Sequence, residues 1–393
     1  MLTAIKAGTL FDSTGADPIS DAVVLVDGDH ITACGPANQV DIPDSAAVID
    51  CADEFVMPGL IDAHTHITII PGLGDQIGQL RQPATAQLIR GIGNLRRNLK
   101  SGVTTARIMA EERYLDIEIK EAVQSGLIPG PNLLVSGVAL TPSNGHGRAL
   151  SSFDGPDEIR KASRENLAAG ADFLKLFLTG GVSSERGGLQ NASYSVAEIR
   201  AATEEAERAG TYAAAHAHGG PGIQLGVANG VRTIEHALLA SDEDLEAIDK
   251  HGAWVVLTSS ILLHPTGIEQ GDAGNPLIME KVRQARAIAD KNLPRIIGSG
   301  VKYSIGTDSM HGLMRFEMEC LVRFGASNHD ALLAATVRAA EVCQIADQVG
   351  TIEAGKKADI ISVRGNPLAD ITAMQSVSLI MKGGEQVDQL SEM

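Results

Sequence analysis

Four histidines and one aspartate end short apolar segments, where their side chains could bind a metal ion. They are His64 and His66 in LIDAHTH, His216 in AAAHAHG, His236 in TIEHALLA and Asp308 in GTDS. Imidazole nitrogens and carboxylate oxygens suit Zn²⁺ and similar divalent ions. His64 and His66 are two residues apart, so on a strand they share one face and can bind one ion. A lone His-x-His more often reflects packing, but its position after VMPGLIDA favours a ligand pair.

Lys175 lies within the apolar run FLKLFLTGG, which predicts a buried strand. Burying an unpaired ammonium group is costly, and desolvation lowers the pKa of a lysine. The neutral amine can attack CO₂ and form a carbamate, whose two oxygens could bridge two metal ions. The alternative is an ordinary lysine that reaches solvent or forms a salt bridge. We expect N6-carboxylysine at Lys175 and two divalent ions, with Zn²⁺ as the expected metal.

Asp308 is the predicted catalytic base. A carboxylate beside a metal-bridging water can take its proton and deliver it to a leaving group. His146, in TPSNGHGR, follows a predicted strand on a glycine-flanked loop, so it is a candidate for substrate binding or oxyanion stabilisation. His218 shares the predicted face of His216 and is either a spare ligand or a substrate contact. Glu235 is expected to point away from the site and to be structural.

Loop residues supply further candidates for substrate contacts. Guanidinium groups pair with carboxylates through two hydrogen bonds, and the candidate clamps are Arg148, Arg186 and Arg315. His311, three residues after Asp308, is a similar candidate. Ser195-x-x-Glu198 is a capping box that begins a helix, so Ser195 is expected to be structural. The sequence contains neither a G-x-S-x-G elbow nor a Walker-type phosphate loop, which argues against serine hydrolases and P-loop enzymes.

Short apolar strands alternate with helical stretches through the middle of the chain. Eight such units in about 290 residues predict an α/β protein with a (β/α)₈ barrel, in which residues at the carboxyl ends of strands meet in one mouth. The first strand ends in His-Thr-His rather than a glycine-rich turn, which argues against a doubly wound sheet. The expected strands cover 60–66, 103–110, 132–140, 171–180, 211–219, 233–240, 253–260 and 301–309.

Both ends of the chain are rich in short β-prone segments. Asp27-Gly28 separates two such segments near the N-terminus and predicts a hairpin. Segments 358–365 and 378–387 are similar. We expect residues 1–57 and 348–393 to form one small β-sandwich domain, and residues 58–347 to form the barrel.

Composition limits the class of protein. The 393 residues carry a formal charge of −17, which disfavours nucleic-acid binding because phosphate backbones repel acidic proteins. The four scattered cysteines indicate reduced thiols. No signal peptide or membrane span is recognisable. We therefore expect a cytoplasmic protein that acts on a small molecule, without a nucleic-acid or membrane partner.

The ordered motifs resemble those of the amidohydrolase superfamily along nearly the whole chain. They are PGLIDAHTH, SGVTTAR, ADFLKLFLTGGVSS, AAHAHG, VRTIEHA, GTDS and IEAGKKADIISVRGNPLADI. The resemblance is greatest to the prolidase-like branch of Xaa-Pro dipeptidases and carboxypeptidases, related to imidazolonepropionase and ochratoxin-hydrolysing amidases. It implies a barrel with a β-sandwich from both termini, a homo-oligomer and a binuclear zinc centre. The implied ligands are His64, His66 and Asp308 for one metal, His216 and His236 for the other, and carboxylated Lys175 as the bridge.

These features predict a binuclear metal-dependent hydrolase. Its expected substrate is a small carboxylate-bearing amide, such as a dipeptide or N-acyl amino acid, attacked by a metal-bridging hydroxide. One alternative is a cyclic-amide hydrolase or deaminase with one metal, and another is an aryl-amide hydrolase of the ochratoxin type. A non-catalytic binding protein on the same barrel is a third, which the complete ligand set disfavours.

Overall fold

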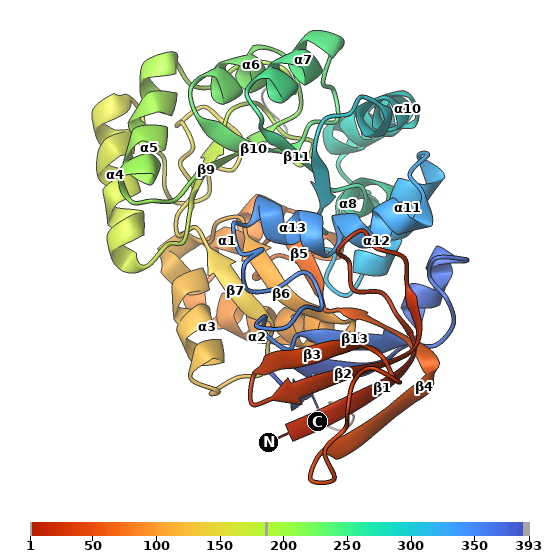
Figure 1. The fold of residues 1–393 in the computed structure, drawn as a ribbon. Helices are drawn as coiled ribbons and strands as arrows, with labels where there is room; N and C mark the ends of the chain where they lie inside the picture. The colour runs from red at the N-terminus through yellow and green to blue at the C-terminus, as the bar shows by residue number, and fades with distance from the viewer. Residues whose placement is uncertain (1, 185–187, 388–393) are drawn as a thin grey trace.

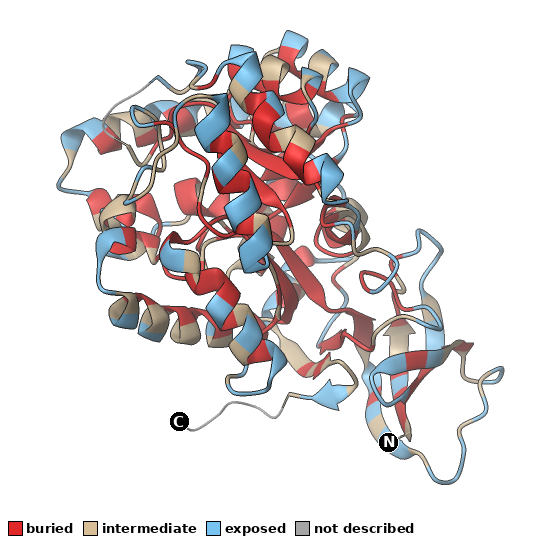
Figure 2. Cartoon of the chain, turned by 90° about the vertical axis from the view of Figure 1, so that its left-hand side faces the viewer, coloured by how far each residue is buried: buried red, intermediate tan, exposed pale blue. Residues whose placement is uncertain are grey.

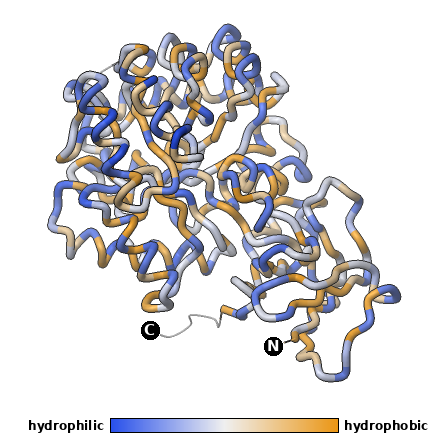
Figure 3. Tube along the Cα trace, turned by 60° about the vertical axis from the view of Figure 1, so that its left-hand side comes forward, coloured by the Kyte–Doolittle hydropathy of each residue, from blue (hydrophilic) through white to orange (hydrophobic). Residues whose placement is uncertain are grey.

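The computed structural model describes residues 2–184 and 188–387 of the chain. Figure 1 shows a barrel of strands and helices, with a β-sheet from both chain ends packed on one side of it. Strands from the first and last parts of the described chain lie together in this sheet. Among the described residues, no helix is both long and apolar enough to span a membrane. Along the outer helices, hydrophilic and hydrophobic residues alternate (Figure 3).

Eight parallel strands in the described ranges form the barrel wall. Most of their residues are buried, because one face packs inside the barrel and the other under the surrounding helices. They are β5 (Leu60–Thr65), β6 (Val103–Ile108), β7 (Asn132–Val135), β8 (Leu174–Phe177), β9 (Ala213–Ala217), β10 (Val231–His236), β11 (Trp254–Leu257) and β12 (Tyr303–Ile305). Regular pairing runs from β5 to β7 and from β8 to β12.

A few isolated backbone hydrogen bonds join these two sheets into a closed barrel. Between β7 and β8, the Leu140 amide donates to the Lys175 carbonyl at 2.8 Å, and the Phe177 amide donates to the Leu140 carbonyl at 3.0 Å. Between β12 and β5, the Asp308 amide donates to the His64 carbonyl at 2.8 Å. The predicted (β/α)₈ fold is confirmed.

Amphipathic helices cover the outside of the barrel, with buried residues on their inner side and exposed residues facing out (Figure 2). The capping box predicted at Ser195 and Glu198 begins α5. The helices are α1 (Gln76–Arg81), α2 (Ala84–Lys100), α3 (Leu115–Gln124), α4 (Pro156–Ala169), α5 (Val196–Arg208), α6 (Pro221–Ala228), α7 (Asp242–Lys250), α8 (Ser260–Leu263), α9 (Ile268–Asp272), α10 (Pro276–Gly298), α11 (Met314–Arg323), α12 (Asn328–Ala334) and α13 (Val337–Val342), with the 3₁₀ turns η1 (Pro71–Leu73), η2 (Glu112–Tyr114) and η3 (Ile371–Gln375).

The chain ends combine in one seven-stranded sheet of order β15-β14-β13-β4-β1-β2-β3. Gly28 has a φ of 61° in the turn between β2 and β3, so the predicted hairpin is confirmed. The central strand β4 pairs with β1 in parallel and with β13 in antiparallel orientation. The strands are β1 (Leu2–Leu10), β2 (Ile19–Asp27), β3 (His30–Pro36), β4 (Ala47–Pro58), β13 (Ile360–Val363), β14 (Val377–Lys382) and β15 (Glu385–Gln386).

Candidate active site

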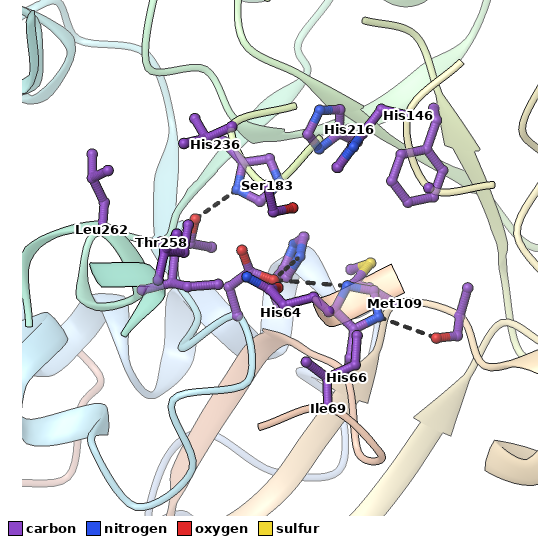
Figure 4. A pocket seen from close by; sticks show the side chains of 18 of the residues that line it. His64, His66, Ile69, Met109, His146, Ser183, His216, His236, Thr258 and Leu262 are labelled. Atoms are coloured by element: carbon purple, nitrogen blue, oxygen red, sulfur yellow. Dashed lines mark hydrogen bonds and ion pairs between the residues drawn. The ribbon is translucent and has the colours of Figure 1, made fainter. Parts of the chain in front are cut away.

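A pocket of about 1110 Å³, including its open mouth, lies at the carboxyl ends of the barrel strands. Figure 4 shows histidines from several strands pointing into it. All six residues predicted to bind metal line this pocket, namely His64, His66, Lys175, His216, His236 and Asp308.

His64, His66 and Asp308 form a compact group that could hold a metal ion. The Nε2 atoms of His64 and His66 lie 3.4 Å and 3.7 Å from the Asp308 Oδ1 atom. His64 Nε2 is buried and has no hydrogen-bond partner among the described residues. A buried imidazole nitrogen without a partner is costly unless another ligand satisfies it. This group is therefore arranged for a cation.

Hydrogen bonds on the far side of three rings orient their Nε2 atoms. His64 Nδ1 lies 2.7 Å from a Glu235 carboxylate oxygen, and His66 Nδ1 donates to the Ala110 carbonyl at 3.1 Å. His236 Nδ1 hydrogen-bonds with the Thr258 hydroxyl at 2.6 Å. An imidazole held in this way has a fixed ring orientation and keeps its other nitrogen for a metal.

His216 has the opposite arrangement. Its Nε2 donates to the Gly180 carbonyl at 3.1 Å, which leaves Nδ1 for a ligand. The His216 ring centroid lies 4.7 Å from that of His236, and the His236 centroid lies 4.8 Å from that of His64. The two histidine pairs from the sequence prediction therefore adjoin one another.

Burial sets the protonation of these groups in a way that suits metal binding. It lowers the pKa of His66 to about 4, and it holds the pKa values of His216 and His236 well below the usual range. Neutral imidazoles offer a free lone pair. At Asp308 burial acts in the raising direction, but the nearby His64 and His66 rings lower the pKa to about 2. The donor set fits a divalent metal.

Lys175 is 1% exposed. Burial is the largest influence on its pKa and lowers it to about 8, despite the opposing charges of Glu235 and Asp308. The lysine nitrogen lies 5.2 Å from the centre of the Phe177 ring. The lowered pKa increases the neutral fraction of Lys175 at neutral pH, and the neutral amine is the form that reacts with CO₂.

Two predicted substrate contacts line the same pocket. His146 Nδ1 lies 2.5 Å from the Ser184 hydroxyl, and its ring centroid lies 4.6 Å from that of His216. His218 Nδ1 is buried without a hydrogen-bond partner in the described part of the chain. Burial lowers the pKa of His146 to about 3 and that of His218 to about 4. Both rings are therefore neutral hydrogen-bonding groups.

The other predicted contacts lie outside the set of described lining residues. Arg148 is exposed and donates to the Ser143 carbonyl at 3.0 Å. His311 Nε2 donates to the Ile69 carbonyl at 3.1 Å. Arg315 pairs with Glu319 on its own helix, α11. Arg186 falls outside the described residues.

Glu235 is fully buried and contacts His64 of the metal-binding group. The interpretation of Glu235 as structural holds in part, because its carboxylate pairs with the buried Arg107 at 2.9 Å and also orients His64. Alternation alone would place Glu235 and His236 on opposite faces. His236 has a φ of 75°, so the backbone turns over at the strand end and brings both side chains toward the site.

Several residues that support the site were not identified from the sequence. Asp62 accepts from the amides of His64 and Thr307, at 3.2 Å and 2.9 Å, and so fixes β5 against the end of β12. Its position two residues before His64, on the same face of a strand, was an available signal. The sequence carried no signal for Thr258 and Gly180, because each contacts its histidine from a distant part of the chain. Thr258 bonds His236 through its hydroxyl, and Gly180 bonds His216 through its backbone carbonyl.

The chain is similar to known proteins along most of its length. A family profile described as "Amidohydrolase family" matches residues 55–387. The chain belongs to the amidohydrolase family. The chain is 30% identical to the ochratoxinase of Aspergillus niger, over 98% of this chain and 86% of that protein. An imidazolonepropionase of Rhizobium rhizogenes is 24% identical over 88% of this chain and 87% of its own.

Solved amidohydrolase structures agree with this assignment. A Xaa-Pro dipeptidase with bound methionine superposes with a TM-score of 0.90, at 27% identity over 98% of this chain and 100% of that one. A prolidase complexed with N-methylphosphonate-L-proline gives a TM-score of 0.91 at 31% identity, over 98% and 99% of the two chains. This amidohydrolase is thus a hydrolase acting on C–N bonds.

Proposed function

We propose that this amidohydrolase is a binuclear metal-dependent enzyme that cleaves an amide bond in a small carboxylate-bearing substrate, such as a dipeptide or N-acyl amino acid. The observation that carries the proposal is the convergence of four histidines, Asp308 and a buried lysine of lowered pKa on one pocket. His64, His66 and Asp308 would hold one ion, and His216 and His236 the other. Lys175, as a carbamate, would bridge them.

Two bound divalent ions would activate water and polarise the scissile carbonyl. The protein contributes the proton transfer. Asp308, ionised because its pKa is about 2, would accept a proton from the attacking water and deliver it to the departing nitrogen. Neutral His146 can donate a hydrogen bond to the oxygen that develops negative charge.

The side of the pocket that carries His146 and His218 would orient the substrate. His146 and His218 are the predicted substrate contacts that line it. A carboxylate placed there would accept hydrogen bonds from imidazole N–H groups and lie near the half-buried Lys281, whose Nζ donates to the Ser184 carbonyl at 2.5 Å.

The test is a screen of dipeptides and N-acyl amino acids on protein loaded with Zn²⁺, Co²⁺ or Mn²⁺. Chelation should abolish hydrolysis, and a divalent ion should restore it. Metal analysis should give two ions per chain in the active protein. Full activity in a protein shown to be metal-free would overturn the proposal.

A one-metal cyclic-amide hydrolase or deaminase is the second candidate. It is favoured by the similarity to proteins named imidazolonepropionase, and by the compact group at His64, His66 and Asp308 that could hold one ion by itself. Lys175 argues against it, because a single ion needs no bridge. Full activity with one ion per chain would favour this candidate.

A further inference from the structure

One wall of the pocket is apolar. It is built by helices that follow two barrel strands, α1 after β5 and α8, α9 and α10 after β11. Turn η1 packs on α9, which joins the two groups of helices. The side chains of this apolar wall include Ile77, Leu80, Leu262, Leu263, Ile268 and Leu293.

The opposite side of the pocket carries hydrogen-bonding groups beside the Phe177 ring, whose centroid lies 5.4 Å from that of His146. Figure 4 shows His146 and Leu262 at opposite sides of the histidine cluster. His146, His218 and Ser183 line the hydrogen-bonding side. A substrate that spans the pocket therefore meets hydrogen-bonding groups at one end and hydrocarbon at the other.

The apolar wall has no charged side chain, and its polar exception is Gln76 of α1, whose buried Nε2 has no hydrogen-bond partner in the described part of the chain. Lys175 is the single basic lysine or arginine side chain among the described lining residues, and it lies with the metal-binding group. Of the acidic lining residues, Asp308 belongs to the metal-binding group, Glu111 accepts from the Thr68 amide at 2.9 Å, and Glu112 accepts from the Leu150 amide at 2.8 Å. An ionised group placed against the leucine and isoleucine side chains of this wall would lose its hydration without gaining an oppositely charged partner.

We infer that the substrate carries a bulky uncharged apolar group, an aryl ring or an alkyl chain of several carbons, which packs against the apolar wall while its polar end lies at His146 and His218. This inference rests on the proposed function and narrows its substrate class. Binding of the apolar group removes both its surface and that of the wall from water, and this surface burial supplies the affinity.

The first experiment measures kcat/KM on metal-loaded protein with two matched series of N-acyl amino acids. One series lengthens the acyl chain at a fixed amino acid, and the other lengthens the apolar side chain of the amino acid at a fixed acyl group. In one of the two series, kcat/KM should rise about fourfold per added methylene until the added chain covers the apolar wall. Cleavage of the short members with no rise in either series would overturn the inference and leave the proposed function intact.

The second experiment is independent of turnover. Octanamide and acetamide are titrated into chelator-treated protein by calorimetry, and octanamide should bind at least tenfold more tightly. Leu263→Asp and Ile77→Asp, at half-buried positions of the wall, should each lower octanamide affinity at least tenfold. Leu277→Asp is the control, because Leu277 is 59% exposed on α10 and does not line the pocket.

The two experiments separate the possible failures. Equal binding of both amides to folded wild-type protein would overturn the inference, whatever the enzyme hydrolyses. Tight octanamide binding without hydrolysis of any member of either series would support binding at the apolar wall and contradict the proposed function. Circular dichroism identifies a variant that fails to fold, in which case the other wall position decides.

Discussion

Lys175 combines burial with a lowered pKa, and its chemical state distinguishes a two-metal from a one-metal centre. Carbamate formation joins the neutral amine to CO₂ and releases one proton, so a carboxylate-like group replaces an ammonium in the same space. That change converts an unfavourable buried cation into a ligand for two cations.

Lys175→Ala is expected to lose at least one metal ion per chain and nearly all activity, because the bridge supplies an oxygen to each ion. Added acetate or propionate should restore part of both by occupying the vacated space. Metal analysis and a hydrolysis assay check the two effects. Lys120→Ala, which removes a lysine paired with Asp172 at 2.6 Å, should retain its metal. Unchanged metal content in Lys175→Ala would indicate an ordinary lysine.

Asp308→Asn is expected to keep the fold and much of the metal, and to lower kcat by about 10²–10⁴-fold. The amide matches the carboxylate in shape but cannot accept the proton. Steady-state kinetics alongside metal analysis separates lost proton transfer from lost metal. A variant within a few-fold of the wild type would transfer the proton-transfer role to His146 or His218.

Glu111→Gln addresses a buried carboxyl group that lines the pocket. Burial raises the pKa of Glu111 to about 8, so the folded protein retains a proton that the unfolded chain loses near pH 4.5. Stability must therefore fall as pH rises from about 4.5 to 8, by a few kcal/mol for this group. Glutamine has no proton to lose, so the variant should show a flatter decline. Denaturant unfolding of metal-free protein at several pH values measures the slope, and parallel wild-type and variant slopes would contradict the assignment.

The histidines, lysine and aspartate that line the pocket could largely be predicted from the sequence, whereas their supporting contacts could not. Alternation along a strand places His64 and His66 together, and the barrel prediction brings His216, His236 and Asp308 to the same mouth. The hydrogen bonds from Arg107 to Glu235 join β6 to β10 across 128 residues, and no local pattern encodes that pairing.

At the level of elements, the barrel strands are shorter than the apolar runs that predict them. The run at 171–180 yields a strand only at Leu174–Phe177, because the following residues leave the wall and enter the mouth. There the Gly180 carbonyl orients His216. Hydropathy marks such residues as strand-like, although their backbone groups serve the site.

The ends of β5 and β12 approach so closely that one position admits only glycine. A Cβ atom at Gly306 would lie 2.4 Å from the His64 backbone nitrogen. The same region includes Asp308, whose φ of 47° is unusual for a residue other than glycine. Close backbone contact and local strain together fix the geometry of the predicted ligands.

Gly306→Ala is therefore expected to push β12 away from β5, to weaken metal binding and to destabilise the fold by about 1–3 kcal/mol. Denaturant unfolding and metal titration measure the two effects. Gly298→Ala provides the control, since a Cβ atom there meets no other atom within 4 Å. Equal stability and metal affinity in the two variants would show that the strands can separate without consequence.

Over the whole molecule, the proposed metal centre connects strands from across the barrel. Ions that bind only the folded chain must raise its stability, by about 2.7 kcal/mol when the free ion is at 100 times its Kd. We therefore expect Zn²⁺ to raise the Tm of chelator-treated protein measurably. The double variant His64→Ala and His66→Ala should show a much smaller rise, and an equal rise would place the stabilising ion elsewhere.

The terminal sheet has a consequence for how the protein is made on the ribosome. Strand β4 ends at Pro58, but its antiparallel neighbour β13 begins at Ile360, roughly 300 residues later. At a synthesis rate of about 5–20 residues per second, one edge of β4 waits some 15–60 seconds for its partner. During that interval the nascent chain presents an unpaired strand edge to other chains. Chaperone capacity during translation, rather than the stability of the finished barrel, would then limit the yield of active enzyme.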